Sequence, residues 1–456
     1  MRNRPPRSAS NRPPTARGVS RRHLFGAGAL AATSLPLAGC STPLAAGLLG
    51  TRVSPDTLIY WNLFGGGDGV RMQDMQQGYR EIYGPNSLQA TTLTWGNPYY
   101  SKLTLATVGN QPPDVAVAHL TRAKPLWSGG LLDPITEEDL AGVGLSSASF
   151  NARNWEEQKV DGQNIAIPLD THPFTLFYNK TVCEQAGLLD ADGLIVDLTG
   201  MDAFEAALAE ISAVTGGLAI TVANVSETST PWRFFWTLYN QIEGVTPFLS
   251  DDGATISVDE EAFIEVMSKV QHWVDQGWLN SGLDYATSQT TMFAGDSGFY
   301  LQGEWEIATA QSIEGLEFGM APVPQVYDRP AVQADSHTFI LPHMDRTPEQ
   351  KQNAMEFIKA MLEQSLIWAE GGHIPSYLPT FESQEYQDLE PQRYYAESAD
   401  YAVYTDAAWY SGSGSTFENT VGAQLGLVQQ GLLTPEQALQ AIRDQLEIYT
   451  TTPSPL

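Results

Sequence analysis

The sequence predicts an α/β protein. Short apolar runs alternate with amphipathic segments of helical period through the body of the chain, and Gly and Pro separate them, as in proteins that cover a sheet with helices. At 456 residues the chain has room for two or three domains of about 100–200 residues each. No long low-complexity linker divides the body, so we expect short crossings between its domains.

The first 39 residues predict a cleaved export signal. Arg21 and Arg22 precede a short run of apolar and small residues that continues to Leu37-Ala38-Gly39-Cys40. A basic start, a short apolar stretch and a small-residue cleavage site are typical of a signal peptide, and the stretch is shorter than the about 20 residues of a spanning helix. The arginine pair resembles a twin-arginine signal, and an ordinary secretory signal is the alternative.

Cys40 is the expected first residue of the mature chain. The four residues that end at Cys40 resemble a bacterial lipobox, whose Cys carries the lipid. We therefore expect an anchor on the outer face of the bacterial cytoplasmic membrane and a tether at residues 40–55. Cys183, the other cysteine, is expected to be unpaired and buried. Two cysteines exclude a disulfide framework and metal sites of the Cys-x-x-Cys type.

The charge of the mature chain is strongly negative. Residues 1–39 hold seven Arg and no acid, which leaves 17 basic and 53 acidic residues, a net charge of −36, in residues 40–456. Phosphate contacts need clustered Lys and Arg, so we expect no nucleic-acid partner. No second apolar run of about 18 residues follows the signal, so we expect a soluble body held by its anchor.

Eight short runs bounded by turn residues are the predicted strands. They stand at residues 58–61, 91–94, 115–118, 165–167, 174–178, 218–222, 298–301 and 338–341.

Capping residues mark three helix starts. Residues 347–350 and 434–437 both read Thr-Pro-Glu-Gln, which places Thr at the cap and Pro at the first helical position. Ser257 and Glu260 are interpreted as a further capping box, and Gly277 as the left-handed residue that ends that helix.

Aromatic residues stand beside glycines and polar residues where predicted strands end. Trp61-Asn62-Leu63-Phe64 leads into the glycine-rich residues 65–69, and residues 95–100 leave another strand in the same way. The crevice beyond strand ends is where open α/β sheets bind ligands. A sugar ring stacks on flat apolar faces and needs directed hydrogen bonds, so these residues indicate a sugar site. For each single aromatic the alternative is burial in the core.

Three other chemistries lack their sequence patterns. The histidines show no His-x-x-x-His spacing, so no metal site and no cofactor are expected, and His272 falls on the surface of an amphipathic helix. Residues 65–69 lack the order and the Lys of a phosphate-binding loop. Gly412-Ser413-Gly414 lacks the strand-turn-helix context of a nucleophile elbow.

Eight short motifs, each weak alone, occur in order over roughly residues 56–380. They stand at residues 58–62, 111–115, 130–134, 167–172, 177–180, 185–188, 293–295 and 303–305. Together with the lipobox they resemble the family 1 extracellular solute-binding proteins, the sugar receptors of bacterial ABC importers that are related to maltose-binding protein. The last 75 residues match only in helical character.

The resemblance implies the two-lobed periplasmic-binding-protein-like fold of type II. In that fold a multi-strand hinge joins two α/β lobes, and the ligand cleft lies between them. By analogy, residues 56–167 and 290–340 would form lobe one, residues 168–289 and 341–456 would form lobe two, and residues 165–170 would be the first crossing.

The resemblance and the strand-end pattern together give the expected ligand-binding residues. Aromatics are expected to stack on sugar rings, and polar side chains to bond the hydroxyl groups. The expected set is Trp61, Asn62, Phe64, Gly66, Trp95, Tyr99, His119, Arg122, Asp170, Thr171, His172, Trp232, Glu304, Trp305, His337 and His373.

The expected function is binding of a carbohydrate, an oligosaccharide, and its delivery to the permease subunits of an ABC importer by a monomeric lipoprotein without catalysis. Two alternatives stay open. A secreted glycoside hydrolase needs two carboxylates about 5–10 Å apart, for which Asp170 and Glu304 are the nominated pair. The same receptor fold for a non-sugar ligand such as a polyamine is the other.

Overall fold

The computed structural model describes residues 57–455. The expected signal peptide, the lipidation residue Cys40 and the tether up to residue 55 lie outside these residues. None of the helices within residues 57–455 combines the length and apolar character that a membrane crossing requires.

A five-stranded sheet forms the first half of the body. Strands β1 and β2 and strands β1 and β3 pair in parallel, whereas β12 runs antiparallel to both β3 and β6. The order across the sheet is β2 (Leu88–Thr92), β1 (Leu58–Asn62), β3 (Val115–His119), β12 (His337–Ile340) and β6 (Ile167–Pro168).

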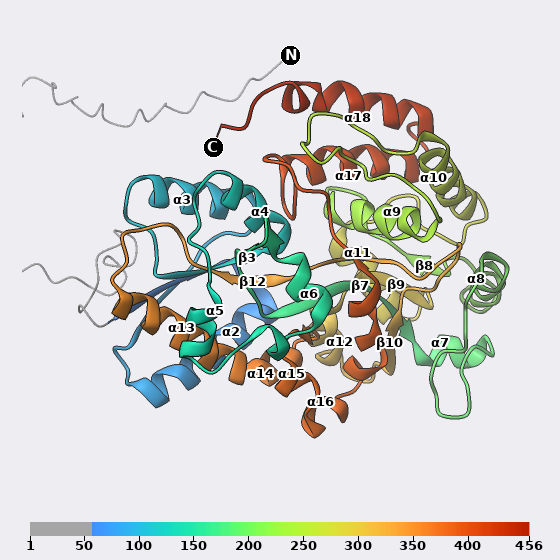
Figure 1. Cartoon of the computed structure of the whole chain (residues 1–456). Coiled ribbons are helices and arrows are strands. Elements are labelled where there is room, and N and C mark those ends of the chain that lie inside the picture. Colours follow the sequence, from blue (N-terminus) through green and yellow to red (C-terminus); the bar gives the residue numbers. More distant parts are fainter. Residues whose placement is uncertain (1–56, 456) are drawn as a thin grey trace, which may run out of the picture. The chain divides into compact units, whose positions relative to one another are not determined.

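Helices pack on this sheet and close a core around Tyr60, Phe339 and Phe357. Helices α13 and α14, drawn in orange, lie beside α2 although they are far from it in the sequence (Figure 1). The helices of this half are α2 (Gly66–Tyr83), α3 (Asn97–Val108), α4 (Leu120–Ser128), α5 (Glu137–Gly142), α6 (Ala152–Glu157), α13 (Pro348–Glu363) and α14 (Ser365–Ala369).

The second sheet is built around the ten-residue strand β7 (Asp170–Asn179), every residue of which is buried. Burial on both faces accounts for the apolar residues Phe174, Leu176, Phe177 and Tyr178 in its second half, whereas its first half carries the buried polar residues Asp170, Thr171 and His172. The other strands are β8 (Ile220–Thr221), β9 (Phe299–Gly303), β10 (Phe318–Pro322), β11 (Val332–Asp335), β13 (Ile374–Pro375) and β14 (Ala402–Val403).

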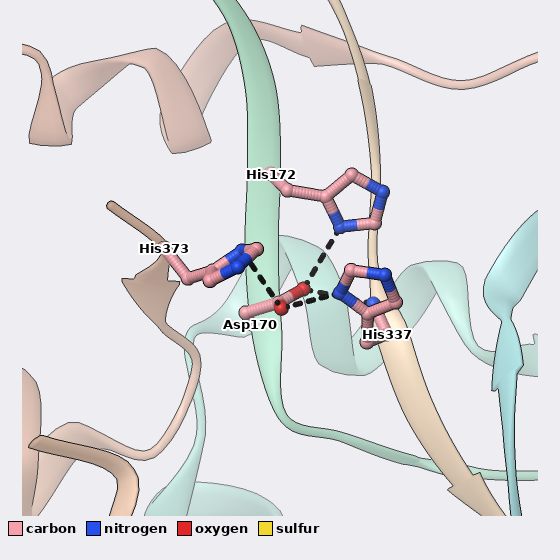
Figure 2. Close-up of side chains that lie close together, drawn as sticks. All are labelled: Asp170, His172, His337 and His373. Carbon is pink, nitrogen blue, oxygen red and sulfur yellow. Dashed lines mark hydrogen bonds and ion pairs between the residues drawn. The ribbon is translucent and has the colours of Figure 1, made fainter. Parts of the chain in front are cut away.

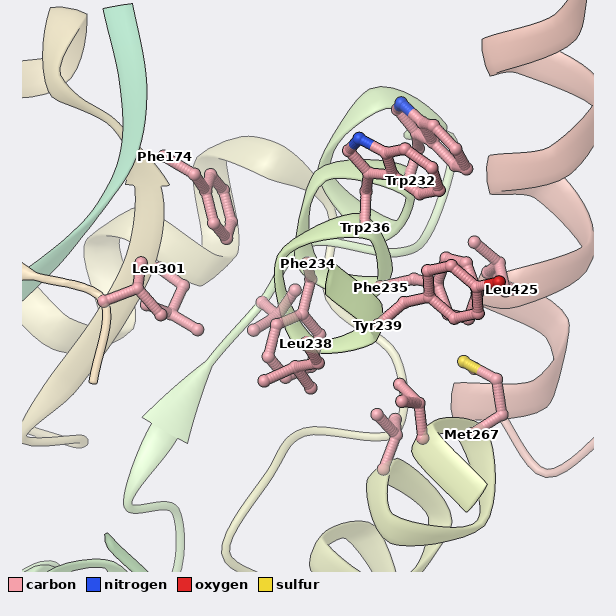
Figure 3. Packing of buried hydrophobic residues seen from close by; sticks show 14 of the residues in the cluster. Phe174, Trp232, Phe234, Phe235, Trp236, Leu238, Tyr239, Met267, Leu301 and Leu425 are labelled. Carbon is pink, nitrogen blue, oxygen red and sulfur yellow. The ribbon is translucent and has the colours of Figure 1, made fainter. Parts of the chain in front are cut away.

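Helix α9 (Ser229–Gln241) lies in the centre of the second core, which Figure 3 shows from close by. Phe235 and Tyr239 face helices α10 (Glu260–Asp275) and α17 (Thr416–Gln429), while Phe234 and Leu238 point toward the sheet. The remaining helices of this half are α7 (Lys180–Gln185), α8 (Met201–Thr215), α11 (Tyr285–Phe293), α12 (Ile307–Gln311), α15 (Leu378–Phe381), α16 (Gln384–Gln387) and α18 (Pro435–Thr450).

The chain passes between the two sheets at short segments. Leu169 separates β6 from β7, within the expected crossing at residues 165–170, and Ser336 separates β11 from β12. Strand β13 pairs with the first two residues of β7, which brings a third segment to the same place. These segments are the hinge strands that join the two halves.

The sheets divide the chain differently from the expected lobes. Strands β9 and β10, expected in lobe one, pair with β7 in the second sheet. Helix α13, expected in lobe two, packs in the core of the first sheet. The expected division switched sides at residues 290 and 340, whereas the chain returns to the first sheet at Ser336 and keeps α13 there, because the apolar face of α13 covers Tyr60 and Phe339.

Two of the three expected helix starts are confirmed. Thr347 and Thr434 each form the predicted capping box with the Gln three residues later. The prediction for Ser257 is wrong, because Asp259 caps α10 by accepting from the backbone N–H groups of residues 261 and 262. Asp259 directly precedes the helix, so its carboxylate caps it in place of the Ser257 hydroxyl. The Ser257 hydroxyl donates to the Pro247 carbonyl instead.

Two single-residue expectations are confirmed by the structure. Gly277 follows α10 with φ of 75°, the left-handed conformation that glycine adopts without steric cost. Cys183 is a free, fully buried thiol, and burial raises its pKa to about 12.

Gly422 of α17 permits the close approach of α17 to the start of α9. A Cβ at Gly422 would lie 1.8 Å from the Thr228 carbonyl oxygen. Alanine ordinarily stabilises a helix by about 1 kcal/mol over glycine, but overpacking against backbone costs about 1–3 kcal/mol. We expect Gly422→Ala to lower the free energy of unfolding in urea titrations. Gly78→Ala is the control, because only the movable end of the Gln364 side chain opposes its Cβ; a stabilised Gly422→Ala protein would contradict the packing argument.

Candidate functional site

A cavity of about 300 Å³ lies where the two halves meet at the hinge strands. Its walls come from strand ends and helix starts of both sheets, so the site exists only when both halves are folded and together. The lining residues are Leu63, Phe64, Gly65, Asp68, Trp95, His119, His172, Glu227, Ser229, Arg233, Tyr285, Trp305 and His337.

The exit of β1 forms one wall. Asn62 is buried, and its side-chain oxygen accepts from the Phe64 N–H at 3.2 Å and from the Thr92 hydroxyl at 3.1 Å. This bond turns the chain so that Phe64 and Gly65 face the cavity. Phe64 packs on His337 and Trp368, with ring centroids 4.8 and 4.7 Å away.

Trp95 leaves β2 and is the most exposed aromatic of the cavity, with 42% of its surface accessible. Its ring meets His119 edge to face at 6.2 Å. Tyr99, expected beside it, instead turns into the core, where its hydroxyl donates to the Val117 carbonyl at 2.6 Å. Of these two aromatic residues, only Trp95 exposes its ring at the cavity.

His119 ends β3 and is held from behind by Tyr100. The Tyr100 hydroxyl accepts from the His119 backbone N–H at 2.9 Å and lies 2.8 Å from Nδ1 of the same residue. Burial, with His337 and His172 acting in the same direction, holds the pKa of His119 well below its ordinary value. His119 is therefore neutral at pH 7.

The carboxylate of Asp170, fully buried between the hinge strands, is the centre of a polar hub (Figure 2). Oδ1 lies 3.0 Å from His172 Nδ1 and accepts from the His337 backbone N–H at 2.8 Å. Oδ2 lies 2.7 Å from His337 Nδ1 and accepts from the Trp368 indole N–H at 2.6 Å. Burial works to raise the pKa of Asp170, but His337 and His172 outweigh it and hold that pKa well below its usual range.

The same hub brings together four residues of metal-ligating types, one Asp and three His. One ligand atom from each of Asp170, His172, His337 and His373 lies within 4.8 Å of the others. Zinc needs lone pairs that converge at about 2.0–2.2 Å. A carboxylate has about four lone-pair sites, and four hydrogen bonds already occupy those of Asp170. The rings of His172 and His337 are stacked, so their nitrogens point in parallel and do not converge on one point. The geometry is therefore that of a hydrogen-bonded hub.

His373 lies beneath the cavity among three carboxyl groups. Its Nε2 lies 3.0 Å from Asp68, and its Nδ1 lies 2.9 Å from Glu304 and 3.3 Å from Asp170. Burial works to lower the pKa of His373, but Asp68 and its neighbours outweigh it and raise that pKa well above the ordinary value. Burial raises the pKa of Glu304 to about 8, against the opposing effect of His373.

Trp305 closes the cavity on the side of the second sheet. Its ring packs on Gly303, where a Cβ would lie 2.0 Å from ring carbons, so only glycine fits there. The Trp305 indole N–H donates to the Tyr285 hydroxyl at 3.0 Å. The Arg233 guanidinium lies over the ring, 4.9 Å from its centroid.

The loop at residues 411–415 bridges the two halves beside the cavity. The Ser413 backbone N–H donates to the Thr121 hydroxyl at 3.1 Å, and the hydroxyls of both residues donate to the buried carboxylate of Asp335. Arg122, expected to face the ligand, lies over the Tyr100 ring and bonds Asn97 instead. Contacts between residues of both halves thus join the halves beside the cavity.

The expected ligand residues fall into three groups. Six line the cavity: Phe64, Trp95, His119, His172, Trp305 and His337. Others stand behind the wall as supports: Asn62, Asp170, Thr171, Glu304 and His373. The rest face elsewhere: Trp61, Gly66, Tyr99, Arg122 and Trp232. Trp232 stands next to Arg233 on α9 but points into the second core, because successive helical residues face different directions.

Sequence reasoning missed several lining residues. Glu227 and Ser229 lie at the start of α9, Tyr285 is the first residue of α11, and Asp68 is in the first turn of α2. The glycine-rich exit of β1 signals Gly65 and Asp68. The other residues do not directly follow a strand, since a loop separates Glu227 and Ser229 from β8, so only the fold brings them to the cavity.

The buried pair of Glu304 and His373 predicts a pH effect. A carboxyl group whose pKa rises to about 8 on folding weakens the folded state as pH rises from about 4.5 to about 8. Glu304→Gln has no carboxyl group to ionise and does not lose this stability. We therefore expect the difference in free energy of unfolding, variant minus unsubstituted protein, to be larger at about pH 7.5 than at about pH 5. Urea unfolding at both pH values measures this. Exposed Glu363→Gln is the control, and an equal difference at both pH values would contradict the prediction.

Comparison with known proteins places this architecture in a family. Residues 95–390, more than half of the chain, match the family described as bacterial extracellular solute-binding protein. The maltodextrin-binding protein MdxE of Bacillus subtilis is 23% identical over 220 residues, which are 46% of this chain and 48% of that protein. The chain thus matches about half the length of that relative.

Solved structures share the two-lobed fold. The GacH receptor of Streptomyces glaucescens, solved unliganded and in complex with acarbose, has a TM-score of 0.70 at 17% identity and covers 86% of this chain and 97% of its own. UgpB of Mycobacterium tuberculosis, solved in complex with glycerophosphocholine, has a TM-score of 0.70 at 16% identity and covers 87% and 98%. The chain belongs to the family of bacterial extracellular solute-binding proteins, with two α/β lobes, a multi-strand hinge and a cleft between the lobes.

Proposed function

We propose that this protein is the carbohydrate receptor of a bacterial ABC importer. The observation that carries the proposal is the wall of the cavity, where Phe64, Trp95 and Trp305 alternate with His119, His172 and His337. Aromatic faces pack against the C–H faces of a sugar ring, and imidazole nitrogens bond its hydroxyl groups without requiring a charge on the ligand.

The relatives support this class of ligand. MdxE is named a maltodextrin-binding protein, and the GacH receptor was solved with acarbose. UgpB was solved with glycerophosphocholine, so the fold alone does not select a sugar. The aromatic rings and imidazoles of the cavity wall are what favour a sugar in this protein. A volume of about 300 Å³ is at the lower end of the about 300–1,000 Å³ of small-molecule sites, so among the oligosaccharides that the sequence led us to expect it favours a short one.

The lobes are proposed to close on the ligand about the hinge strands. Leu169 and Ser336 are the crossing residues, and the bond between Ser413 and Thr121 holds the closed form. The closed lobes would present one surface to the transmembrane permease subunits, with the protein acting as a monomer. Lobe one then comprises residues 57–168 and 336–369, and lobe two residues 170–335 and 374–455.

The protein is proposed to carry out no catalysis. The carboxylates nominated for glycoside hydrolysis, Asp170 and Glu304, are both buried, and neither lines the cavity. His373 lies between them, 3.3 Å from Asp170 and 2.9 Å from Glu304. A general acid must reach the glycosidic oxygen of a bound sugar, which neither group does.

We expect a sugar to raise the melting temperature in a thermal-shift screen of mono-, di- and oligosaccharides, because a ligand that binds only the folded state stabilises it. With the best sugar, Trp95→Ala and Trp305→Ala should each weaken binding at least tenfold in calorimetry, since loss of a buried aromatic contact costs about 1–3 kcal/mol.

Trp278→Ala is the matched control, because Trp278 packs beside His272 away from the cavity. Unchanged affinity in both cavity variants would remove the aromatic faces from the proposal. A response to spermidine and to none of the sugars would contradict the carbohydrate class, and release of products from a glycoside would contradict the receptor role.

The export signal predicts where the receptor acts. We expect the full chain, expressed in a bacterium with lipoprotein processing, to be found in the membrane fraction with lipid on Cys40, after export by the twin-arginine route. Cys40→Ala should move the protein to the soluble exported fraction, which immunoblotting of fractions measures. Arg21→Lys combined with Arg22→Lys, which keeps the charge, tests the route; membrane retention of Cys40→Ala would refute the anchor.

A further inference from the structure

Two stacked imidazoles form the part of the cavity wall nearest the hinge. The ring centroids of His172 and His337 lie 4.0 Å apart, with their planes at 23°. His172 is in β7 of the second sheet and His337 begins β12 of the first, so each lobe supplies one ring. Both rings line the cavity.

Asp170 fixes the direction of both rings from behind. Its carboxylate only accepts, so the hydrogen atoms in its contacts with His172 Nδ1 and His337 Nδ1 belong to the imidazoles. The remaining lone pairs of the carboxylate are taken by the His337 backbone N–H and the Trp368 indole N–H, which only donate. Each ring is therefore held as the Nδ1–H tautomer.

The second nitrogen of each ring is left for a ligand. Figure 2 shows Nε2 of His172 and of His337 on the side of the ring away from Asp170. Within residues 57–455 no group hydrogen-bonds to either Nε2. Burial, with His337 acting in the same direction, lowers the pKa of His172 to about 3, so its Nε2 carries a lone pair at pH 7.

His119 has the opposite polarity. The Tyr100 hydroxyl accepts from the His119 backbone N–H, and we assign its own hydrogen to the contact with His119 Nδ1, 2.8 Å away. The proton of this neutral ring is then on Nε2, which makes it a donor. Three adjacent imidazoles thus present one donor and two parallel acceptors to the cavity.

We infer that His172 and His337 are a specificity-determining acceptor pair, fixed by Asp170, which selects an uncharged ligand with two neighbouring hydroxyl groups over an anionic one. Two hydroxyls of one sugar ring donate to the pair, and a third ligand oxygen accepts from His119. A phosphate or carboxylate oxygen has no hydrogen to donate and faces two lone pairs. Asp68 and Glu227 add carboxylates to the same cavity, against the single guanidinium of Arg233. The class of ligand rests on the proposed function, whereas the polarity of the rings does not.

The polarity is tested without any ligand. Long-range ¹H–¹⁵N NMR of ¹⁵N-histidine-labelled protein at pH 7 separates protonated from unprotonated ring nitrogens. We expect protonated Nδ1 and bare Nε2 for His172 and His337, and the reverse for His119, with exposed His272 as the internal reference. A protonated Nε2 on His172 or His337 would overturn the inference.

The role in binding is tested with variants that keep the hub. His172→Asn and His337→Asn place an amide N–H near the former Nδ1, so the bond to Asp170 is retained, but each removes the Nε2 acceptor. We expect each to weaken binding of the best sugar at least tenfold in calorimetry, with the melting temperature of the free protein nearly unchanged. His272→Asn, far from the cavity, is the matched control. Full affinity in both cavity variants would overturn the inference.

The charge selection is tested with paired ligands. Thermal shifts with glucose and glucose 6-phosphate, and with glycerol against glycerol 3-phosphate and glycerophosphocholine, compare neutral with phosphate-bearing compounds. We expect no shift from any compound that bears phosphate. A shift from one of them that is abolished in His172→Asn would overturn the inference even if the sugar receptor stands. A protein that binds no sugar but shows the expected tautomers would refute the proposed function and keep the acceptor pair.

Discussion

The buried carboxylate of Asp170 is the interaction on which the rest of this structure depends. It accepts hydrogen bonds from His172, His337 and Trp368, which come from different segments of the chain. A charge buried this deeply is tolerated only when its lone pairs are satisfied, and here all of them are. Because its partners come from both sheets, the requirement to satisfy one carboxylate also holds the hinge strands together.

The hub connects the stability of the fold to the chemistry of the cavity. Two of the donors that satisfy Asp170 on one side are the imidazoles of His172 and His337, which line the cavity on the other. His373 continues the arrangement below, between Asp68 and Glu304, so the floor of the cavity is a connected set of acids and imidazoles with aromatic rings packed on them. Rigid, pre-oriented groups of this kind lose little entropy when a ligand binds.

The sequence predicted the cavity wall at the exit of β1 better than the wall formed near the starts of α9 and α11. Asn62 and Phe64 stand at the exit of a strong strand followed by glycines, a local pattern that marks a strand end facing a crevice. Glu227, Arg233 and Tyr285 lie near the starts of helices, where nothing local separates a residue that faces the ligand from one that faces the core. Trp232 and Arg233 are neighbours on α9, yet Trp232 lies in the core and Arg233 lines the cavity.

The α/β class and the caps Thr347 and Thr434 could be predicted from the sequence, because they follow from local hydrogen bonding and from the period of apolar residues, whereas the crossing between β6 and β7 was expected only from the resemblance to the solute-binding family. The tertiary structure decided which histidines meet. His172 stands two residues from Asp170 on the same face of β7, but His337 and His373 are far from both in the sequence, so only the pairing of β7 with β11 and β13, and the short turn from β11 into β12, brings these two to Asp170. The reason is physical: spacing along a chain constrains contacts within one element, whereas burial of a shared carboxylate acts between elements.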